Sequence, residues 1–281
     1  GAILILVVGV LMLGKGNWTH LSLSAPDITP GFGATMVSLI FVTYAYSGWN
    51  AAAYVAGEIV DPGRTIPRAM IGGTLFVGLL YLVVNGIYLY ALPVTELGQP
   101  PILPVANKVA AAMLGPAGTL LVTVLLCLSI AGAVSAMVWV GPRVYYAMAC
   151  DGVIPACFSK TAGLSRTPSN AIVLQSLWAS VLILSGTFER LVIYSGVVLA
   201  IFSALAVGSL MVLRRRNPDL ARPYRVPLYP VVPLCYVALS SAIAVYGLLE
   251  RPIEAGLGIA TVMAGVPLYV LWTQMRGLQR N

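Results

Sequence analysis

The chain has 281 residues, of which 59% are hydrophobic and only 9% are charged, and its formal net charge at pH 7 is +7. Soluble domains carry about 25% charged residues because their surfaces face water, so this composition excludes an ordinary soluble protein. The surface must face lipid instead. Since unpaired strand edges cannot face hydrocarbon, the sequence predicts an all-α polytopic membrane protein.

Apolar runs divide the chain into eight expected membrane helices, because a helix needs about 20 residues to cross a bilayer. In chain order they cover residues 1–14, 34–57, 67–91, 117–149, 170–186, 191–213, 229–249 and 255–275. The first run is too short to span and is interpreted as the end of a longer helix. Proline, glycine and charged residues separate the runs, for example at residues 61–64 and 214–219.

Basic residues are distributed unevenly between the two ends of these helices. One side receives the segments 58–68, 143–168, 214–225 and 276–281. The other side holds only Lys15, Lys108, Arg190 and Arg251, which leaves 12 of the 16 basic residues on the first side. Loops rich in lysine and arginine lie in the cytoplasm, so the first side is expected to be cytoplasmic. A nucleic-acid patch at residues 214–216 is the weaker alternative, because that run adjoins a helix end.

The centre of the expected helix over residues 34–57 is poor in helix-forming residues. Gly48 costs about 1 kcal/mol relative to alanine in a helix, and Ser47 and Asn50 compete for backbone hydrogen bonds. A break at membrane depth is acceptable only where it lines a cavity or is buried in protein. Transporters use such breaks to present carbonyl groups and helix ends to a substrate. The alternative is an intact helix in which Ser47 and Gly48 are close-packing positions.

Three aromatic residues, Tyr44, Tyr46 and Trp49, lie in the same stretch. They are suited to close over the side chain of a bound substrate, beside the neutral hydrogen-bonding group of Asn50. In the competing interpretation these aromatic side chains simply face lipid.

A cluster of charged residues follows this helix at the expected cytoplasmic side. It consists of Glu58, Asp61, Arg64 and Arg68. One hypothesis is an inner gate held by ion pairs that break when the protein opens inward, with Glu58, Arg64 and Arg68 as the gating residues. The other is a solvated loop, in which each ion pair contributes at most about 1 kcal/mol.

Residues 100–115 are apolar on one face, are too short to span and fall on the outer side. They are interpreted as an extracellular lid helix, with an interfacial helix resting on the membrane as the alternative.

The sequence contains no pattern typical of an enzyme or a metal centre. It has no HExxH motif and no phosphate-binding loop. Its four cysteines, Cys127, Cys150, Cys157 and Cys235, show neither metal-ligand spacing nor a disulfide framework. We therefore expect no enzymatic activity, no bound metal and no cofactor.

Several stretches together resemble the amino acid permeases of the amino acid–polyamine–organocation superfamily, in particular the L-type exchangers and their bacterial relatives. Residues 46–50, 57–64 and 66–68 resemble the sixth transmembrane helix and the following cytoplasmic loop. Residues 143–155 resemble the end of helix eight, residues 167–171 with Gln175 the start of helix nine, and residues 222–227 the entry to helix eleven.

The resemblance implies a LeuT-type inverted-repeat fold with two five-helix repeats, of which this chain holds a part. Residues 1–14 would be the end of helix five. Residues 34–213 would form the second repeat, helices six to ten, with the lid helix near residues 100–115. Residues 229–275 would be helices eleven and twelve.

The resemblance also implies roles for single residues. Tyr44 matches an aromatic gate above the substrate, and Ala45, Tyr46 and Ser47 match the unwound carbonyls that receive the substrate amine. Gly48 permits close approach, Asn50 matches a polar position near the substrate, and Trp49 lies beside them with a packing role as an alternative. The absence of a glutamate at Asn50 favours a neutral amino acid substrate.

The function expected from these features is amino acid transport across the cell membrane by alternating access. Coupling to a proton or to a counter-substrate stays open. The competing hypothesis is a membrane sensor or subunit on the same fold that does not transport. The partners expected are the lipid bilayer and a small amino acid, and no nucleic acid.

Overall fold

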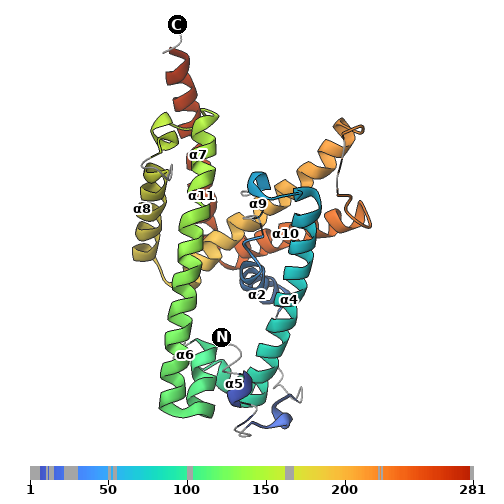
Figure 1. Cartoon of the computed structure of the whole chain (residues 1–281), viewed down its shortest axis with the longest axis vertical. Coiled ribbons are helices and arrows are strands. Elements are labelled where there is room, and N and C mark those ends of the chain that lie inside the picture. The colour runs from blue at the N-terminus through green and yellow to red at the C-terminus, as the bar shows by residue number, and fades with distance from the viewer. Residues whose placement is uncertain are drawn as a thin grey trace. The chain divides into compact units, whose positions relative to one another are not determined.

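In the computed structural model, α-helices and 3-10 helices are the regular secondary structure of the described residues, and no strand occurs among them (Figure 1). These residues are 7–10, 12, 16–21, 31–49, 52, 56–99, 104–161, 168–220, 222 and 224–278. The chain divides into two compact units. Unit 1 contains Gly1–Thr29 and Ala69–Met137, and unit 2 contains Pro30–Arg68 and Val138–Asn281.

Unit 1 is built around the ends of two long helices, α4 (Pro62–Ala91) and α6 (Val105–Val140), with the one-turn helix α5 (Val94–Leu97) between them in the chain. Its core joins Ile87 and Ala91 of α4 to Val109, Met113 and other residues of α6. The short 3-10 helix η1 (Trp18–Leu21) lies at the end of α4. There the rings of Trp18 and Tyr90 have centroids 4.7 Å apart.

The helix α6 reverses direction at Gly115, which has φ 67° and ψ −169° and is followed by Pro116. Asn107 Nδ2 donates a hydrogen bond of 3.2 Å to Thr123 Oγ1 across this point. In a continuous helix, residues 16 positions apart would lie about 24 Å from each other along the axis. The segment 105–114 therefore folds back on the segment that follows Pro116. The extracellular position of this short helix stays a prediction.

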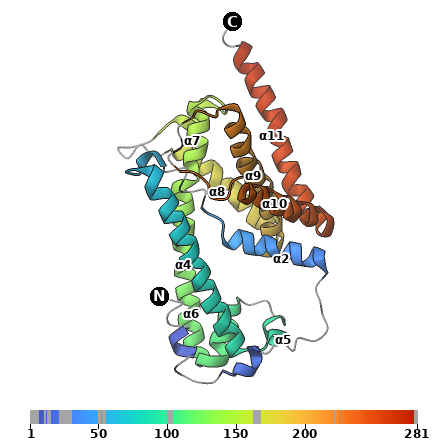
Figure 2. The same cartoon turned by 90° about the vertical axis from the view of Figure 1, so that its right-hand side faces the viewer.

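Unit 2 contains the remaining helices, shown in Figures 1 and 2. In chain order they are α2 (Phe32–Ala45), the 3-10 helix η2 (Ala56–Glu58), α7 (Pro142–Cys150), the 3-10 helix η3 (Ala156–Ser159), α8 (Ser169–Ser185), α9 (Phe188–Arg216), α10 (Val231–Glu250) and α11 (Pro252–Leu278). The helix α9 is central, because α2, α10 and α11 all pack against it. The core of this unit is formed by α2, α9, α10 and α11 around Ile40, Ile193 and Val197.

Two ion pairs connect the starts of α9 and α11. Arg251 donates to Glu189 at 3.0 Å, and Arg190 lies 3.8 Å from Glu254. All four residues fall at the helix ends that the charge distribution places outside. Trp272 Nε1 of α11 donates to the carbonyl of Gly152 at 3.3 Å, which links α11 to the turn after α7.

Among the residues that the structure describes, five helical segments are long and apolar enough to cross a membrane: Pro62–Ala91, Val105–Cys150, Phe188–Arg216, Val231–Glu250 and Pro252–Gln274. Two further apolar helices, α2 with 14 residues and α8 with 17, are shorter. They fall within the expected helices over residues 34–57 and 170–186. Most of the expected segment 1–14 lies outside the described residues, although residues 7–10 and 12 are helical. The predicted all-α membrane class is confirmed.

Candidate functional site

The chain leaves the helical conformation at Ala45, within the stretch where the sequence predicts a break. The amide of Tyr46 donates to the carbonyl of Val42 at 3.1 Å and that of Ser47 to the carbonyl of Tyr44 at 3.0 Å. Residues 46–49 then form a turn. The helix expected to extend toward residue 57 is therefore interrupted after its first 14 residues.

Gly48 is the residue that makes this turn unsuitable for a helix. Its φ of +99° lies in a region that residues with a side chain rarely adopt. No atom lies within 4 Å of a Cβ built at this position. Glycine is therefore favoured here by the backbone conformation and not by crowding from neighbouring atoms. A helix C-terminus carries a partial negative charge on its carbonyl groups, so this end of α2 is suited to a cationic group such as an ammonium.

The aromatic residues of the stretch have accessible side chains. Tyr44 is 41% exposed, Tyr46 37% and Trp49 43% within the described residues. All three flank the end of α2, where they offer apolar surface beside a polar backbone. This is the general composition of a small-molecule site. Asn50, the last residue of the predicted site, lies outside the described residues.

The predicted gating residues lie at the start of α4. The carbonyl of Asp61 accepts hydrogen bonds from the amides of Arg64 at 3.2 Å and Thr65 at 3.0 Å. Arg64 and Arg68 are one turn apart, on the same helix face. Among the described side chains, Asp61 forms no ion pair with either arginine. The backbone of Glu58 belongs to η2, but its side chain lies outside the described residues.

Within the described part of the chain, no group of three or more His, Cys, Asp or Glu residues is arranged to hold a metal ion. The four cysteines are free and exposed. A polar cavity that the sequence did not predict lies in the loop between α9 and α10. The sequence assigns its arginines, such as Arg214 and Arg222, to the cytoplasmic side, but it does not show that they line one cavity.

Comparison with known proteins decides the family. The model of the amino acid permease family matches residues 2–266. The chain belongs to the amino acid permease family. Family membership assigns it the LeuT-type inverted-repeat fold, and together with the five apolar helices it identifies a multi-pass protein of the cell membrane.

Several curated proteins are similar to this permease chain over nearly all of its length. It is 26% identical over 279 residues to the large neutral amino acids transporter small subunit 2 of Homo sapiens, covering 95% of this chain and 50% of that protein. It is 32% identical over 271 residues to the serine/threonine exchanger SteT of Bacillus subtilis, covering 94% and 60%. It is 27% identical over 276 residues to the cystine/glutamate transporter of Homo sapiens, covering 96% and 53%. The permease chain thus spans about half the length of the curated relatives it matches.

Proposed function

We propose that the full-length protein to which this chain belongs is a secondary active transporter that moves amino acids across the cell membrane by alternating access. The observation that carries the proposal is the end of α2 at Ala45 followed by the positive φ of Gly48. Close packing does not require a glycine here, because no atom lies within 4 Å of a Cβ built at Gly48. The relatives are named as transporters and exchangers of amino acids, which supports a transport function and not an enzymatic one.

The proposed substrate site is the turn after α2. The carbonyls of Ala45, Tyr46 and Ser47 receive the substrate ammonium group, because the helix end concentrates partial negative charge there. Gly48 brings the backbone close to the substrate. Asn50 supplies a neutral hydrogen bond.

The aromatic side chains form the apolar part of the proposed site. Tyr44 covers the substrate as a gate, and Tyr46 and Trp49 contact its side chain. Their exposure in unit 2 leaves them accessible for this contact.

We propose that the substrate is a neutral amino acid. No charged residue occurs between residues 31 and 57. A substrate with a charged side chain would need a compensating charge at membrane depth, because an unpaired charge there is expensive. The ammonium and carboxylate groups common to all amino acids can instead be held by helix ends. Exchange against a second amino acid is the mode suggested by the exchanger among the relatives.

The proposed inner gate consists of Glu58, Arg64 and Arg68. The two arginines project from the first two turns of α4, which follows the substrate site in the chain. Their side chains are exposed. They are therefore available to pair with a carboxylate when the cytoplasmic side closes.

The test is uptake into liposomes that contain the purified full-length protein. We expect saturable, stereoselective uptake of radiolabelled neutral amino acids when the liposomes are loaded with unlabelled amino acid or carry a pH gradient. Empty liposomes are the control. If flux is absent under both conditions although the protein binds amino acids, the non-transporting sensor replaces this proposal.

A further inference from the structure

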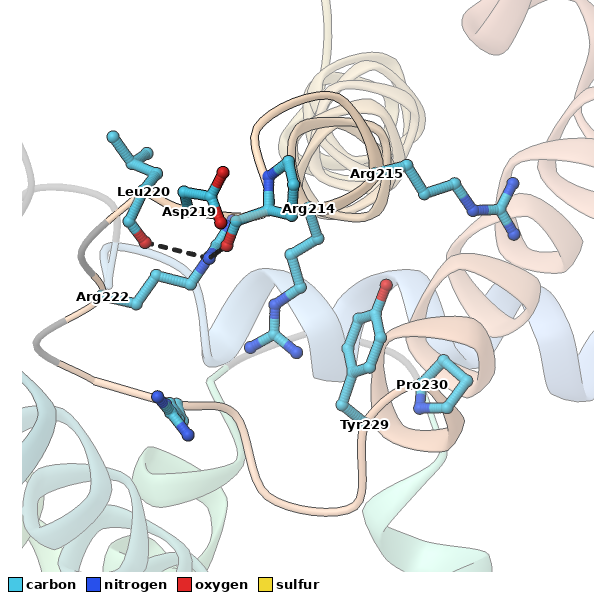
Figure 3. Close-up of a pocket in the computed structure, with 9 residues that line it drawn as sticks. Arg214, Arg215, Asp219, Leu220, Arg222, Tyr229 and Pro230 are labelled. Carbon is cyan, nitrogen blue, oxygen red and sulfur yellow. Dashed lines mark hydrogen bonds between the residues drawn. The ribbon is translucent and has the colours of Figure 1, made fainter.

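The loop that joins α9 to α10 lines an open cavity of about 760 Å³ (Figure 3). Its lining includes Arg214, Arg215, Arg222, Arg225, Asp219 and Tyr229. Four arginines against one aspartate leave a surplus of three positive charges. Among the described side chains, Asp219 forms no ion pair with any of them. A cavity with this charge attracts an anion.

Arg222 lines the cavity and stabilises the loop that forms it. Its guanidinium donates hydrogen bonds to the carbonyls of Asn217 at 2.6 Å, Pro218 at 2.8 Å and Leu220 at 2.9 Å. The bond to Leu220 is visible in Figure 3. These donors are already used, so Arg222 holds the loop in shape and contributes its charge but few free hydrogen bonds.

The position of the Arg214 side chain is suited to binding an anion. Its guanidinium carbon lies 4.0 Å from the centroid of the Tyr229 ring, and the two side chains lie next to each other in Figure 3. Its Nε is buried and has no hydrogen-bond partner among the described residues. A stacked guanidinium keeps the donors at its edge, and these match two oxygens of a phosphate.

The position of the cavity indicates where the anion comes from. Arg214 and Arg215 lie in the last turn of α9, at the end that the charge distribution assigns to the cytoplasm. Tyr229 lies just before α10 begins at Val231. The cavity thus lies between the ends of two helices that are long and apolar enough to span a membrane, which would place it near the lipid headgroups. The cytoplasmic leaflet is the one whose anionic lipids attract basic segments.

A second, apolar groove of about 710 Å³ is lined by α9 and α10, together with Ile259 of α11. On α9 the groove residues Gly208 and Val212 continue, at helical spacing, to Arg215. On α10 the groove residue Val237 lies two turns from Pro230, which also lines the cavity. On both helices, the residues that line the groove and those that line the cavity therefore lie along one face. A ligand with a charged headgroup and an apolar chain could occupy both.

We propose that this cavity binds the phosphate group of an anionic phospholipid of the cytoplasmic leaflet, with one acyl chain in the groove between α9 and α10. Arg214 and Arg215 contact the phosphate, Tyr229 supports Arg214, and Arg222 holds the loop. This site is separate from the proposed substrate site and does not depend on transport.

The test measures lipid retention by the purified, delipidated full-length protein with native mass spectrometry. Dioleoylphosphatidylglycerol is titrated beside dioleoylphosphatidylcholine, which carries no net charge, and beside soluble glycerol 3-phosphate. We expect phosphatidylglycerol to bind in preference to both. Arg214→Ala should weaken its binding roughly tenfold, because a charged group with hydrogen bonds is lost. Arg214→Lys keeps the charge but loses the planar fork, so it should also weaken binding while preserving the fold.

Arg216→Ala is the matched control, because Arg216 lies in the same last turn of α9 but does not line the cavity. It removes one surface charge and should weaken binding at most about fivefold. Equal losses for Arg214→Ala and Arg216→Ala, or full binding by Arg214→Lys, would show attraction to surface charge alone and overturn the proposal. Equal binding of glycerol 3-phosphate and phosphatidylglycerol would assign the cavity to a soluble phosphate compound and overturn the lipid assignment.

Discussion

Ile40 of α2 occupies the centre of the unit 2 core and is only 1% exposed. A Cβ added at Gly196 of α9 would overlap its Cγ2 methyl group, and one added at Gly247 of α10 would lie 2.7 Å from the Val197 side chain. Small residues at these positions let helices approach closely in a membrane, where association depends on packing. The position of α2, and with it the start of the proposed site, depends on these two glycines.

Gly196→Ala should therefore destabilise the protein by about 1–3 kcal/mol, because overpacking a close contact forces neighbours to move. Thermal unfolding of the full-length protein in detergent measures the effect. Gly208→Ala is the control on the same helix, since nothing lies within 4 Å of its added Cβ. If the two variants unfold at the same temperature, the close contact between α2 and α9 does not exist.

Gly48→Ala should act on binding more than on stability. The added methyl meets no neighbour, but it disfavours the backbone at φ +99° by about 1–3 kcal/mol. We expect the turn to relax into another conformation, and substrate affinity to fall roughly tenfold because that conformation must be reversed on binding. Scintillation proximity binding of a labelled neutral amino acid measures this loss.

Gly57→Ala is the matched control for this variant. Its Cβ also has open space, and its backbone is not in the left-handed region. We expect Gly57→Ala to bind substrate like the unmodified protein and both variants to express equally. Unchanged binding by Gly48→Ala would remove the turn after Ala45 from the site.

At the scale of elements, the reversal of α6 places its first turns beside the end of α5. Lys108 Nζ donates to the carbonyl of Leu97 at 3.1 Å and also to that of Gln99. One side chain thus satisfies the carbonyl of the last residue of α5 and that of a residue just after it, where intrahelical bonds are lacking.

Lys108→Met removes these hydrogen bonds while keeping most of the apolar stem. We expect amide hydrogen exchange to accelerate in residues 94–99, because local opening no longer breaks a contact with α6. Exchange in α10 of unit 2 serves as the internal reference and should not change. Equal protection of residues 94–99 in both proteins would contradict this role of Lys108.

Some elements follow directly from the sequence. Apolar run length predicts α9, α10 and α11 to within a few residues, because each helix satisfies its own backbone in lipid. The end of α2 falls where Ser47 and Gly48 predict it. These features depend on residues that lie within one or two helical turns of each other in the chain, so they can be predicted from the sequence.

Other features depend on residues far apart in the chain, and the sequence does not display them. Glu189 pairs with Arg251, 62 positions later, and nothing in the sequence near either residue indicates this contact. The sequence separates residues 100–115 from the next span but does not show that they fold back to join Asn107 to Thr123. Arg222 was counted as a cytoplasmic charge, although its main contacts are three carbonyls of its own loop.

On the scale of the whole molecule, the membrane helices bury little of their surface within the chain. Between 6% and 22% of the residues in their most apolar stretches are buried. Lipid or the remainder of the full-length protein must cover the rest, because apolar surface of this extent is not left exposed to water. Stability and binding are therefore best measured on the full-length protein in a lipid or detergent environment.

The unequal lengths of two consecutive helices have a consequence for the bilayer itself. At 1.5 Å per residue, the 17 residues of α8 extend about 26 Å and the uncharged residues 191–213 of α9 about 35 Å, against a hydrocarbon thickness of about 30 Å. No single thickness matches both helices. A thick bilayer must thin around α8, whereas α9 can tilt, and each ångström of mismatch costs a fraction of a kcal/mol. The tilt of α9 should therefore change with membrane thickness. In membranes that differ in acyl-chain length, the same protein would hold α9 at different tilts.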